Sequence, residues 1–439
     1  MRCLRALISL ALPIGLVTFG PPVRAAEPSD ADLLAGAVAR IDKHRKADVV
    51  ITVRDAAGRP VPSARVEVEQ TRHAFLFGCN LFLFGRAGND RAEAAYRERF
   101  AGLFNYATLP FYWPSYERRR GQPDHARIEK MARWCRDHGI TPKGHPLAWN
   151  FADPPWLPDG AAEVRALQMA RIDDCVKHFR STIDVWDVVN EATHFERDEF
   201  KKRAPRMTAM WQETGRLEFV RECFRHARDA GPKATLLIND YRTDDAYAAL
   251  LRELSEGKGG RPFDVIGIQS HMHGGPWSNA RVWEVCERFA RFGVPLHFTE
   301  TTIVSGERAK TGDAWPSTAD GEKRQGEEVE RFYTMLFSHP AVEAITWWDF
   351  SDRGAWQRAP AGFVRADMSP KPAYERLRRL VRERWWTHTT VKTGACGEAP
   401  CRAFLGEYRV TVTTDSGARA VATLSVTKKG DTRLTVKLP

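Results

Sequence analysis

Between residues 74 and 385, eight short runs of β-branched and aromatic residues alternate with longer segments of helical periodicity. The runs are 74–80, 104–109, 141–149, 184–190, 234–240, 264–271, 295–301 and 343–349. The helical segments include 126–138, 161–180, 217–230, 246–254, 280–292, 321–337 and 373–382. Eight strands, each followed by a helix over about 300 residues, match the count and size of a (β/α)8 TIM barrel. A doubly wound open sheet is less favoured, because no Gly-x-Gly-x-x-Gly turn follows any run.

Polar and aromatic residues gather at the ends of the predicted strands, where a purely structural strand does not need them. They are His145, Trp149, Asn190, Glu191, Asn239, Asp240, Tyr241, Gln269, His271, Glu300, Trp347, Trp348 and Asp349. The carboxyl ends of barrel strands converge on one face, where the active site is built. Carboxylates, amides and tryptophans in one cup are typical of a sugar site, because sugar rings stack on aromatic faces while hydroxyls take hydrogen bonds.

Glu191 and Glu300 are the candidate catalytic residues, and each directly follows an apolar stretch, in the fourth and the seventh run. Glycoside hydrolysis needs one carboxylic acid to protonate the leaving oxygen and one carboxylate to attack the anomeric carbon or activate water. Asn190 is placed to hold a sugar hydroxyl beside the bond being broken. A single such Glu is ordinarily solvated or salt-bridged, but the pair together with Asn190 and His271 favours a functional site.

One segment, residues 186–191 with the sequence WDVVNE, resembles the acid/base signature of glycoside hydrolase family 10, the retaining endo-β-1,4-xylanases. The order and rough spacing of that family are also matched by KGHPLAWN, NDY, GIQSH, FTETT and ITWWDFSD, so the resemblance covers about residues 74–380. It implies a (β/α)8 barrel with Glu191 as general acid/base and Glu300 as nucleophile, forming a covalent glycosyl-enzyme intermediate. It also implies Asn190 on the sugar 2-hydroxyl, His271 bonded to the nucleophile, and His145, Gln269 and Trp348 lining the reactive subsite. No metal or organic cofactor is required.

The sequence departs from the family pattern on the glycone side of the site. Residues 108–112 (TLPFY) stand where the family has a Glu-Asn-x-x-Lys clamp. Asn150 replaces a second His, Thr302 an Asp that supports the nucleophile, and Asp349 a Gly. We therefore expect an apolar and aromatic wall and a substrate that is xylan or a modified or branched glycan. The further expected substrate contacts are Trp113, Trp149, Tyr241, Asn150 and Trp356.

We assign the barrel to residues 74–385. The segments before and after it predict an accessory β unit. In the N-terminal segment, 26–73, two alternating strands flank a Gly-Arg-Pro-Val-Pro turn and predict a hairpin. The C-terminal segment, 386–439, shows three more strand patterns. Neither end is large enough for an independent sheet, so we expect 386–439 to pair with 48–72 in one β-sandwich-like unit. A structural cap is favoured over a carbohydrate-binding module, because no aromatic stripe is apparent on these strands.

The first 25 residues predict a secretory signal peptide. Arg2 and Arg5 precede an apolar run, 6–19, that is too short for a membrane span. We therefore expect an exported, periplasmic or secreted monomer with no membrane span. The formal net charge of +10 is spread through an almost equally acidic background, so no nucleic-acid partner is predicted.

The cysteines divide into one adjacent pair and several scattered residues. Cys396 and Cys401 flank a Gly-containing loop and are expected to form a disulfide in an oxidising compartment. The scattered residues lie among apolar neighbours and are interpreted as buried thiols or undetermined pairs; they are Cys79, Cys135, Cys175, Cys223 and Cys286.

These patterns predict an exported retaining glycoside hydrolase that acts on a polysaccharide or oligosaccharide. The alternative is a catalytically silent glycan-binding barrel, because the glycone clamp and the Thr302 position are altered. The presence of both Glu191 and Glu300 favours the enzyme, since a silent binder has no physical reason to keep both.

Overall fold

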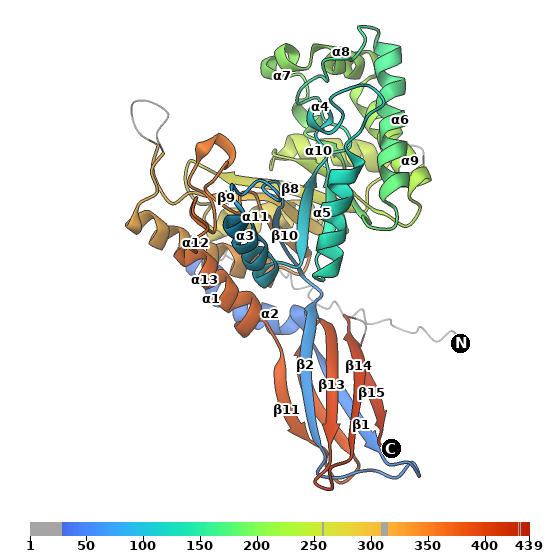
Figure 1. Cartoon of the computed structure of the whole chain (residues 1–439), viewed down its shortest axis with the longest axis vertical. Helices are drawn as coiled ribbons and strands as arrows, with labels where there is room; N and C mark the ends of the chain where they lie inside the picture. The colour runs from blue at the N-terminus through green and yellow to red at the C-terminus, as the bar shows by residue number, and fades with distance from the viewer. Residues whose placement is uncertain (1–28, 257–258, 309–314, 429, 431) are drawn as a thin grey trace, which may run out of the picture.

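Eight parallel strands close into a barrel in the order β10-β3-β4-β5-β6-β7-β8-β9 (Figure 1). The computed structural model describes residues 29–256, 259–308, 315–428, 430 and 432–439. The strands are β3 Leu76–Asn80, β4 Tyr106–Pro110, β5 Thr141–His145, β6 Val185–Asn190, β7 Thr235–Asp240, β8 Val265–Met272, β9 Leu296–Ile303 and β10 Val342–Trp347. Each strand overlaps one of the eight predicted runs, so the predicted (β/α)8 barrel is confirmed.

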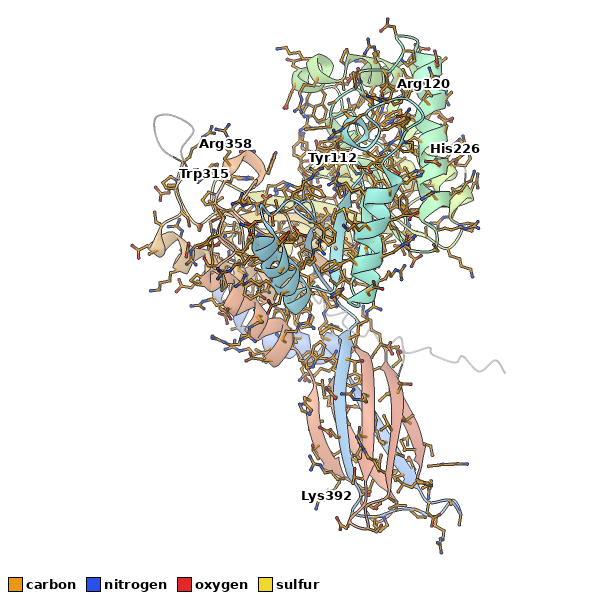
Figure 2. The ribbon with its side chains drawn as sticks, viewed as in Figure 1. Tyr112, Arg120, His226, Trp315, Arg358 and Lys392 are labelled. Atoms are coloured by element: carbon orange, nitrogen blue, oxygen red, sulfur yellow. The ribbon has the colours of Figure 1, made fainter. Side chains whose placement is uncertain are left out.

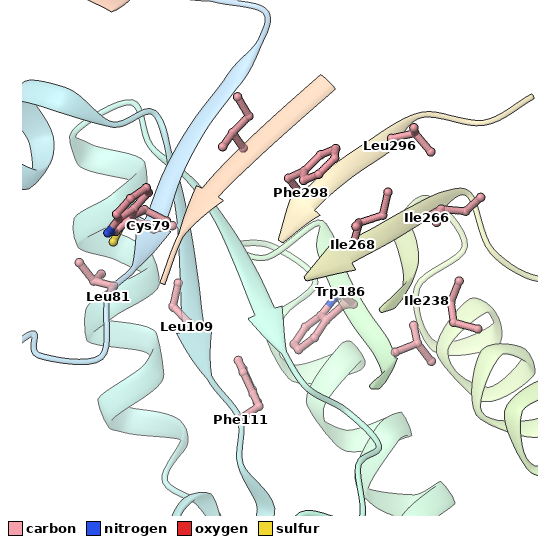
Figure 3. Packing of buried hydrophobic residues seen from close by; sticks show 14 of the residues in the cluster. Cys79, Leu81, Leu109, Phe111, Trp186, Ile238, Ile266, Ile268, Leu296 and Phe298 are labelled. Carbon is pink, nitrogen blue, oxygen red and sulfur yellow. The ribbon is translucent and has the colours of Figure 1, made fainter. Parts of the chain in front are cut away.

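Amphipathic helices cover the outside of the barrel. They are α3 Asp90–Leu103, α5 His125–Asp137, α6 Ala161–Phe179, α9 Arg216–Ala230, α10 Asp245–Glu256, α11 Asn279–Ala290, α12 Ala319–Ser338 and α13 Pro372–Arg379. Side chains such as Asn89 and Ser278 cap the first turns of α3 and α11. Outward-facing strand residues, among them Ile268 and Phe298, pack in the main hydrophobic core (Figure 3). This core fixes the strands and thereby the residues at their carboxyl ends.

Short helices lie in the loops at the carboxyl ends of the strands. They are α4 Trp113–Tyr116 after β4, and α7 Asp198–Arg203 with α8 Pro205–Thr214 after β6 (Figure 1). Inside the barrel, an apolar layer of Tyr106, Val185, Leu237, Val265 and Ala344 forms a separate small cluster. The buried pair Lys143–Asp187 also lies inside, and the candidate catalytic groups follow toward the carboxyl ends of the strands.

Strands from both ends of the chain form a two-sheet β unit. One sheet has the order β12-β1-β15, built from β1 Lys46–Arg54, β12 Glu398–Phe404 and β15 Thr432–Lys437. The other has the order β11-β2-β13-β14, built from β2 Arg65–His73, β11 His388–Lys392, β13 Gly406–Thr413 and β14 Arg419–Val426. The predicted accessory unit made from N- and C-terminal segments is therefore confirmed.

The predicted N-terminal hairpin is wrong, because β1 and β2 lie in different sheets. β1 pairs with β12 and β15, whereas β2 pairs with β11 and β13. Alternation buries Val49 and Ile51 of β1 and Val66 and Val68 of β2 in one shared core. The turn between β1 and β2 thus crosses from one sheet to the other, and C-terminal strands supply the hydrogen-bond partners.

The β unit adjoins the barrel at the amino ends of the strands. Helix α2, Ala37–Arg45, packs against α12, and Arg45 donates to the carbonyl oxygens of Phe337 at 2.6 Å and Val342 at 2.7 Å. Lys428 bonds Glu343 at the start of β10 at 2.9 Å. Figure 2 shows Tyr112 at the opposite end of the barrel from the β unit, whose far tip carries Lys392. The candidate site and the β unit therefore lie on opposite faces.

The expected disulfide between Cys396 and Cys401 is wrong, because both residues are free thiols. Cys401 lies within the extended strand β12, which begins at Glu398. A strand rises about 3.3 Å per residue, so the strand carries Cys401 away from the turn that holds Cys396. A disulfide needs the two Cα atoms within about 7 Å. The other described cysteines are buried free thiols.

Two expectations concern membranes and export. Among the described residues, no helix is long and apolar enough to cross a bilayer. The predicted signal peptide, 1–25, lies outside the described residues.

Candidate active site

A shift in strand register turns the end of β6 toward the barrel interior. Asp187 and Asn190 are three positions apart and would face opposite sides of a regular strand. The pairing of β6 with β7 shifts between Asp187 and Val189. As a result both side chains find partners inside the barrel, and Asn190 accepts a hydrogen bond from Asn239 at 2.8 Å. Glu191 follows directly after this irregularity.

A second irregularity orients Glu300 on β9. The register of β9 against β8 shifts between Ile268 and Gln269, and Thr299 is the additional residue on β9. Bulges occur beside active sites because they re-aim a side chain. Here the neighbours Thr299 and Glu300 both contact Asn239: Thr299 Oγ1 donates to Asn239 Oδ1 at 2.5 Å, and Asn239 Nδ2 donates to Glu300 Oε1 at 2.8 Å.

Three amide side chains connect the two carboxylates. Asn239 donates both to Glu300 and to Asn190 Oδ1. Gln269 Nε2 lies 3.3 Å from Asn190 Oδ1 and 3.2 Å from Glu191 Oε1. The hydrogen-bonded series Glu300, Asn239, Asn190, Gln269, Glu191 therefore holds both carboxylates in one cup, as the sequence predicted for four of these five residues.

Glu300 is held by a neutral imidazole. His271 Nε2 lies 3.1 Å from Glu300 Oε2, and His271 Nδ1 lies 2.8 Å from Thr302 Oγ1. Burial lowers the pKa of His271 to about 3, so the ring is neutral. Because a carboxylate only accepts, Nε2–H donates to Glu300 and Nδ1 accepts from the Thr302 hydroxyl. Burial raises the pKa of Glu300 to about 7, although the charges of His145 and Lys143 oppose this rise.

Glu191 has a strained backbone and a cationic partner. Its φ of 57° and ψ of 40° are left-handed, which costs a non-glycine residue about 1 to 3 kcal/mol and is typical of functional sites. Its backbone N–H donates to the Asn239 carbonyl at 2.8 Å. Arg197 Nη2 donates to Glu191 Oε2. Burial raises the pKa of Glu191 to about 7, Arg197 opposes this rise, and the charges of Glu300 and Asp240 add to it.

His145 stands between a buried ion pair and Glu300. Its Nδ1 bonds Asp187 Oδ2 at 2.7 Å, and Lys143 Nζ bonds the same oxygen at 2.7 Å. Burial alone raises the pKa of Asp187, but Lys143 and His145 outweigh it and keep that pKa below its usual value. The second ring nitrogen of His145, Nε2, faces Glu300. It lies 3.8 Å from Glu300 Oε1 and has no hydrogen-bond partner among the described residues, so it is available to a substrate hydroxyl.

An aromatic wall lines the region where the family clamp is absent. The ring of Tyr112 lies 5.8 Å from the rings of Phe82, Trp149 and Phe151. Trp348 meets Phe82 edge-on at 5.4 Å. Burial, together with the charges of both candidate catalytic carboxylates, raises the pKa of Tyr112 well above its usual value. The predicted aromatic replacement of the clamp therefore has a structural counterpart.

Two further predicted residues lie at the rim of this cup. The ring of Trp356 is 44% exposed and lies 4.6 Å from the ring of His271. Tyr241 bonds His194 Nδ1 through its hydroxyl at 2.8 Å, and Arg197 lies 4.9 Å from its ring. Trp356 thus contacts His271, which bonds Glu300. Tyr241 contacts Arg197, which bonds Glu191.

The structure does not bring Trp113 and Asn150 to the carboxylates. Trp113 is buried, donates through its indole N–H to Glu117 at 2.8 Å and packs edge-on against Trp156. Asn150 is fully buried, and its amide donates to the Phe195 carbonyl and the Thr208 hydroxyl. Both side chains hold loops in place around the cup.

Sequence reasoning did not select Arg197, Asn239 or Tyr112 as site residues. Asn239 lies at the end of a predicted strand and Tyr112 within the altered clamp, so the sequence holds a positional signal for both. Arg197 lies in a loop six positions after Glu191, in a segment rich in both charges, and no periodicity marks it. Its place becomes apparent only when the loop is folded against Glu191.

A closed eight-stranded barrel with paired buried carboxyls on its fourth and seventh strands, amide donors and aromatic rings is a site of the glycoside hydrolase class. The family model for glycosyl hydrolase family 10 matches residues 84–380, which is more than half of the chain. The chain therefore belongs to glycosyl hydrolase family 10.

Individual relatives are more distant. The chain is 27% identical over 414 residues to Anti-sigma-I factor RsgI6 of Acetivibrio thermocellus, covering 91% of this chain and 49% of that protein. It is 25% identical over 417 residues to Endo-1,4-beta-xylanase 1 of Arabidopsis thaliana, covering 90% of this chain and 39% of that protein. The chain thus spans about half or less of the length of these two relatives.

Among solved structures, the chain is similar to the crystal structure of native xylanase 10B from Thermotoga maritima. The TM-score is 0.59 at 24% sequence identity, covering 71% of this chain and 96% of that one. At this identity, the likeness supports the fold alone.

Proposed function

We propose that the protein is a glycoside hydrolase that cleaves β-1,4 linkages of xylan, or of a substituted relative of xylan, with retention of anomeric configuration. The observation that carries this proposal is the series of amides that fixes Glu191 and Glu300 in one buried cup. Membership of family 10 supports the same chemistry. Retaining enzymes use such a pair as acid/base and nucleophile.

In the first step, Glu300 is the nucleophile and Glu191 the general acid. A carboxylate oxygen of Glu300 attacks the anomeric carbon, and its carbon–oxygen bond to the leaving sugar breaks. The proton of the Glu191 carboxyl passes to the departing oxygen, so the leaving sugar departs as a neutral alcohol. His271 and Asn239 keep Glu300 oriented for this attack by donating one hydrogen bond to each of its oxygens.

In the second step, water replaces the leaving sugar. Glu191, now ionised, takes a proton from the water as its oxygen attacks the anomeric carbon, and the ester bond to Glu300 breaks. Two inversions return the original configuration. Asn190 and His145 Nε2 are placed to bond hydroxyls of the sugar held over Glu300.

A second candidate function is glycan binding without turnover. Two observations favour it: Arg197 is ion-paired with Glu191, and one relative carries the name of an anti-sigma factor. We nevertheless place hydrolysis first, because both carboxyl groups are buried and hydrogen-bonded in one cup, as a retaining hydrolase requires of its acid and nucleophile. Export directed by residues 1–25 belongs to the same proposal.

The test is product analysis on a panel of polysaccharides with two nucleophile rescues. We expect xylooligosaccharides from xylan, with the β anomer appearing first in time-resolved NMR, and inactive Glu191→Gln and Glu300→Gln proteins. With an activated aryl β-xyloside and azide, Glu191→Ala should yield the β-glycosyl azide and Glu300→Ala the α-glycosyl azide. Binding to the same glycans without products from the wild-type protein would establish the silent alternative.

A further inference from the structure

Arg197 places a cation directly on the candidate general acid. Its Nη2 donates to Glu191 Oε2, while Gln269 Nε2 donates to the other oxygen of that carboxyl, Oε1. The guanidinium lies 4.0 Å from the ring of Phe200 and 4.9 Å from that of Tyr241. Stacking between two rings holds a planar guanidinium in a defined orientation. The ion pair is therefore a built feature of this site.

This ion pair opposes the first step of the proposed reaction. A general acid must carry its proton when the glycosidic bond breaks. A cation at hydrogen-bond distance favours the ionised carboxylate instead. Because the surroundings of Glu191 are otherwise buried, the carboxyl would hold its proton if Arg197 found another anion.

Arg197 is able to accept a second anion. Its side chain is 23% exposed, whereas that of Glu191 is 8% exposed. Its Nε has no hydrogen-bond partner among the described residues. The nearby Asp240 does not compete, since its oxygens accept from the backbone N–H groups of Thr193 and Arg242. The Arg197 side chain is thus partly open to substrate, and its buried Nε–H is a donor that no described residue uses.

The position of Arg197 indicates which sugar it faces. Glu300, His271 and Asn239 hold the sugar whose anomeric carbon reacts. Arg197 reaches Glu191 from the side of the loops that follow β6 and β7. Its guanidinium packs there against the rings of Phe200, after β6, and Tyr241, after β7. Since Glu191 hands its proton to the leaving oxygen, the group next to Arg197 is the leaving sugar.

We propose that Arg197 is a specificity-determining residue that binds the carboxylate of a uronic acid substituent on the leaving-group side of the substrate and thereby releases Glu191. This inference rests on the proposed hydrolase function and names its substrate class. A carboxylate matches the fork of a guanidinium in a bidentate pair. Binding of the charged substrate then lets the Glu191 carboxyl hold its proton. An uncharged glycan leaves the Arg197–Glu191 pair in place.

The test uses two substrates that differ in one functional group. One is a xylooligosaccharide with a glucuronic acid branch; the other is the same compound with the carboxyl reduced to a primary alcohol. We expect the wild-type kcat/KM to be about tenfold higher for the acid, the effect of one charged hydrogen-bonded pair. In Arg197→Gln this ratio should fall to about one, and in Arg197→Lys, which keeps the charge and loses the fork, it should be intermediate.

The matched control is Lys201→Gln. Lys201 lies on α7, is 49% exposed and pairs with Asp198 at 3.8 Å, so the variant removes one positive charge from the same segment without touching Glu191. It should keep the wild-type ratio. Because the ratio compares two substrates within one protein, partial misfolding of a variant does not alter it.

Three results would overturn the inference. An equal wild-type kcat/KM for the two substrates would reject it and leave the hydrolase proposal standing. An unchanged ratio in Arg197→Gln would assign the preference to other residues. Cleavage of neither substrate would overturn the inference, and failure to cleave any glycan of the polysaccharide panel as well would overturn the proposed function.

Discussion

Burial brings the pKa values of Glu191 and Glu300 to about 7 each. Glu300 must be ionised to attack, so activity falls as pH drops below its pKa. Glu191 must be protonated to serve as acid, so activity falls as pH rises above its pKa. We therefore predict a narrow, bell-shaped dependence of kcat/KM on pH. Its maximum should lie near pH 7, and kcat/KM should decline about tenfold per pH unit on either side. Initial rates on soluble xylooligosaccharides from pH 4 to pH 10 would measure it.

The control for this profile separates the two limbs. An aryl glycoside with a good leaving group needs no proton, so Glu191→Ala should keep the acidic limb and lose the alkaline limb on that substrate. A broad optimum centred near pH 5 would mean that the carboxyls are far better solvated than their burial indicates.

Thr302 is the hydrogen-bond partner of the imidazole beside the nucleophile. Its hydroxyl bonds His271 Nδ1 at 2.8 Å, and the buried ring is neutral. In Thr302→Asp, a carboxylate at this atom would raise the pKa of His271, and a protonated ring would lower the pKa of Glu300. We predict that the acidic limb of the kcat/KM profile moves to lower pH in this variant.

The matched control for Thr302→Asp is Thr301→Val. Thr301 is the preceding residue on β9, and its hydroxyl bonds Ser270 at 2.8 Å without touching His271. The control should keep the wild-type position of the acidic limb. An acidic limb that does not move in Thr302→Asp would show that His271 has no electrostatic influence on Glu300.

At the scale of the elements, the bulge on β9 orients Asn239. The Thr299 hydroxyl donates to Asn239 Oδ1, which turns the amide N–H groups toward Glu300 and Asn190. Thr299→Val keeps the shape of the side chain and removes this donor, so the amide is free to turn. We predict that kcat falls about tenfold, the effect of one lost hydrogen bond of about 1 to 1.5 kcal/mol.

The control for Thr299→Val is another buried threonine of the barrel. Thr346 Oγ1, on β10, is buried and has no hydrogen-bond partner among the described residues. Thr346→Val should leave kcat unchanged and leave the melting temperature equal or higher, because it removes an unpaired buried polar group. Equal loss of kcat in both variants would mean that barrel packing, rather than Asn239, is responsible.

The sequence predicted elements better than it predicted their irregularities. Strand and helix periodicities located all eight barrel strands, and the polar residues of these runs predicted Glu191 and Glu300, which lie directly after β6 and within β9. The bulge at Thr299 and the ion pair of Arg197 left no periodic signal, because each depends on contacts between segments distant in sequence. The predicted hairpin failed for the same reason: alternation marks which residues are buried, not which strand supplies their backbone partners.

At the scale of the whole molecule, N- and C-terminal segments of the described chain close one β unit, which lies at the opposite end of the barrel from Tyr112 (Figure 2). Its core consists mainly of valine, alanine, leucine and isoleucine side chains, with Tyr408 as the buried aromatic residue. Among the described residues of this unit, Val421 is the exposed large hydrophobic residue, and it is not aromatic. Sugar-binding surfaces use exposed aromatic rings. These features favour the prediction that the unit is a structural cap.

A matched pair of substitutions tests this prediction. Val66 is fully buried on β2, so Val66→Asp places an unpaired charge in the core of the β unit and should cost about 3 to 5 kcal/mol. Val421→Asp makes the same change at a position of the same unit that is 56% exposed, and it should be neutral. We predict that Val66→Asp lowers the temperature of the first melting transition. Below that temperature, kcat on soluble oligosaccharides and binding to insoluble xylan should both stay unchanged. If Val66→Asp instead loses binding to insoluble xylan and keeps kcat, the β unit carries a glycan-binding surface, since only that role separates the two measurements.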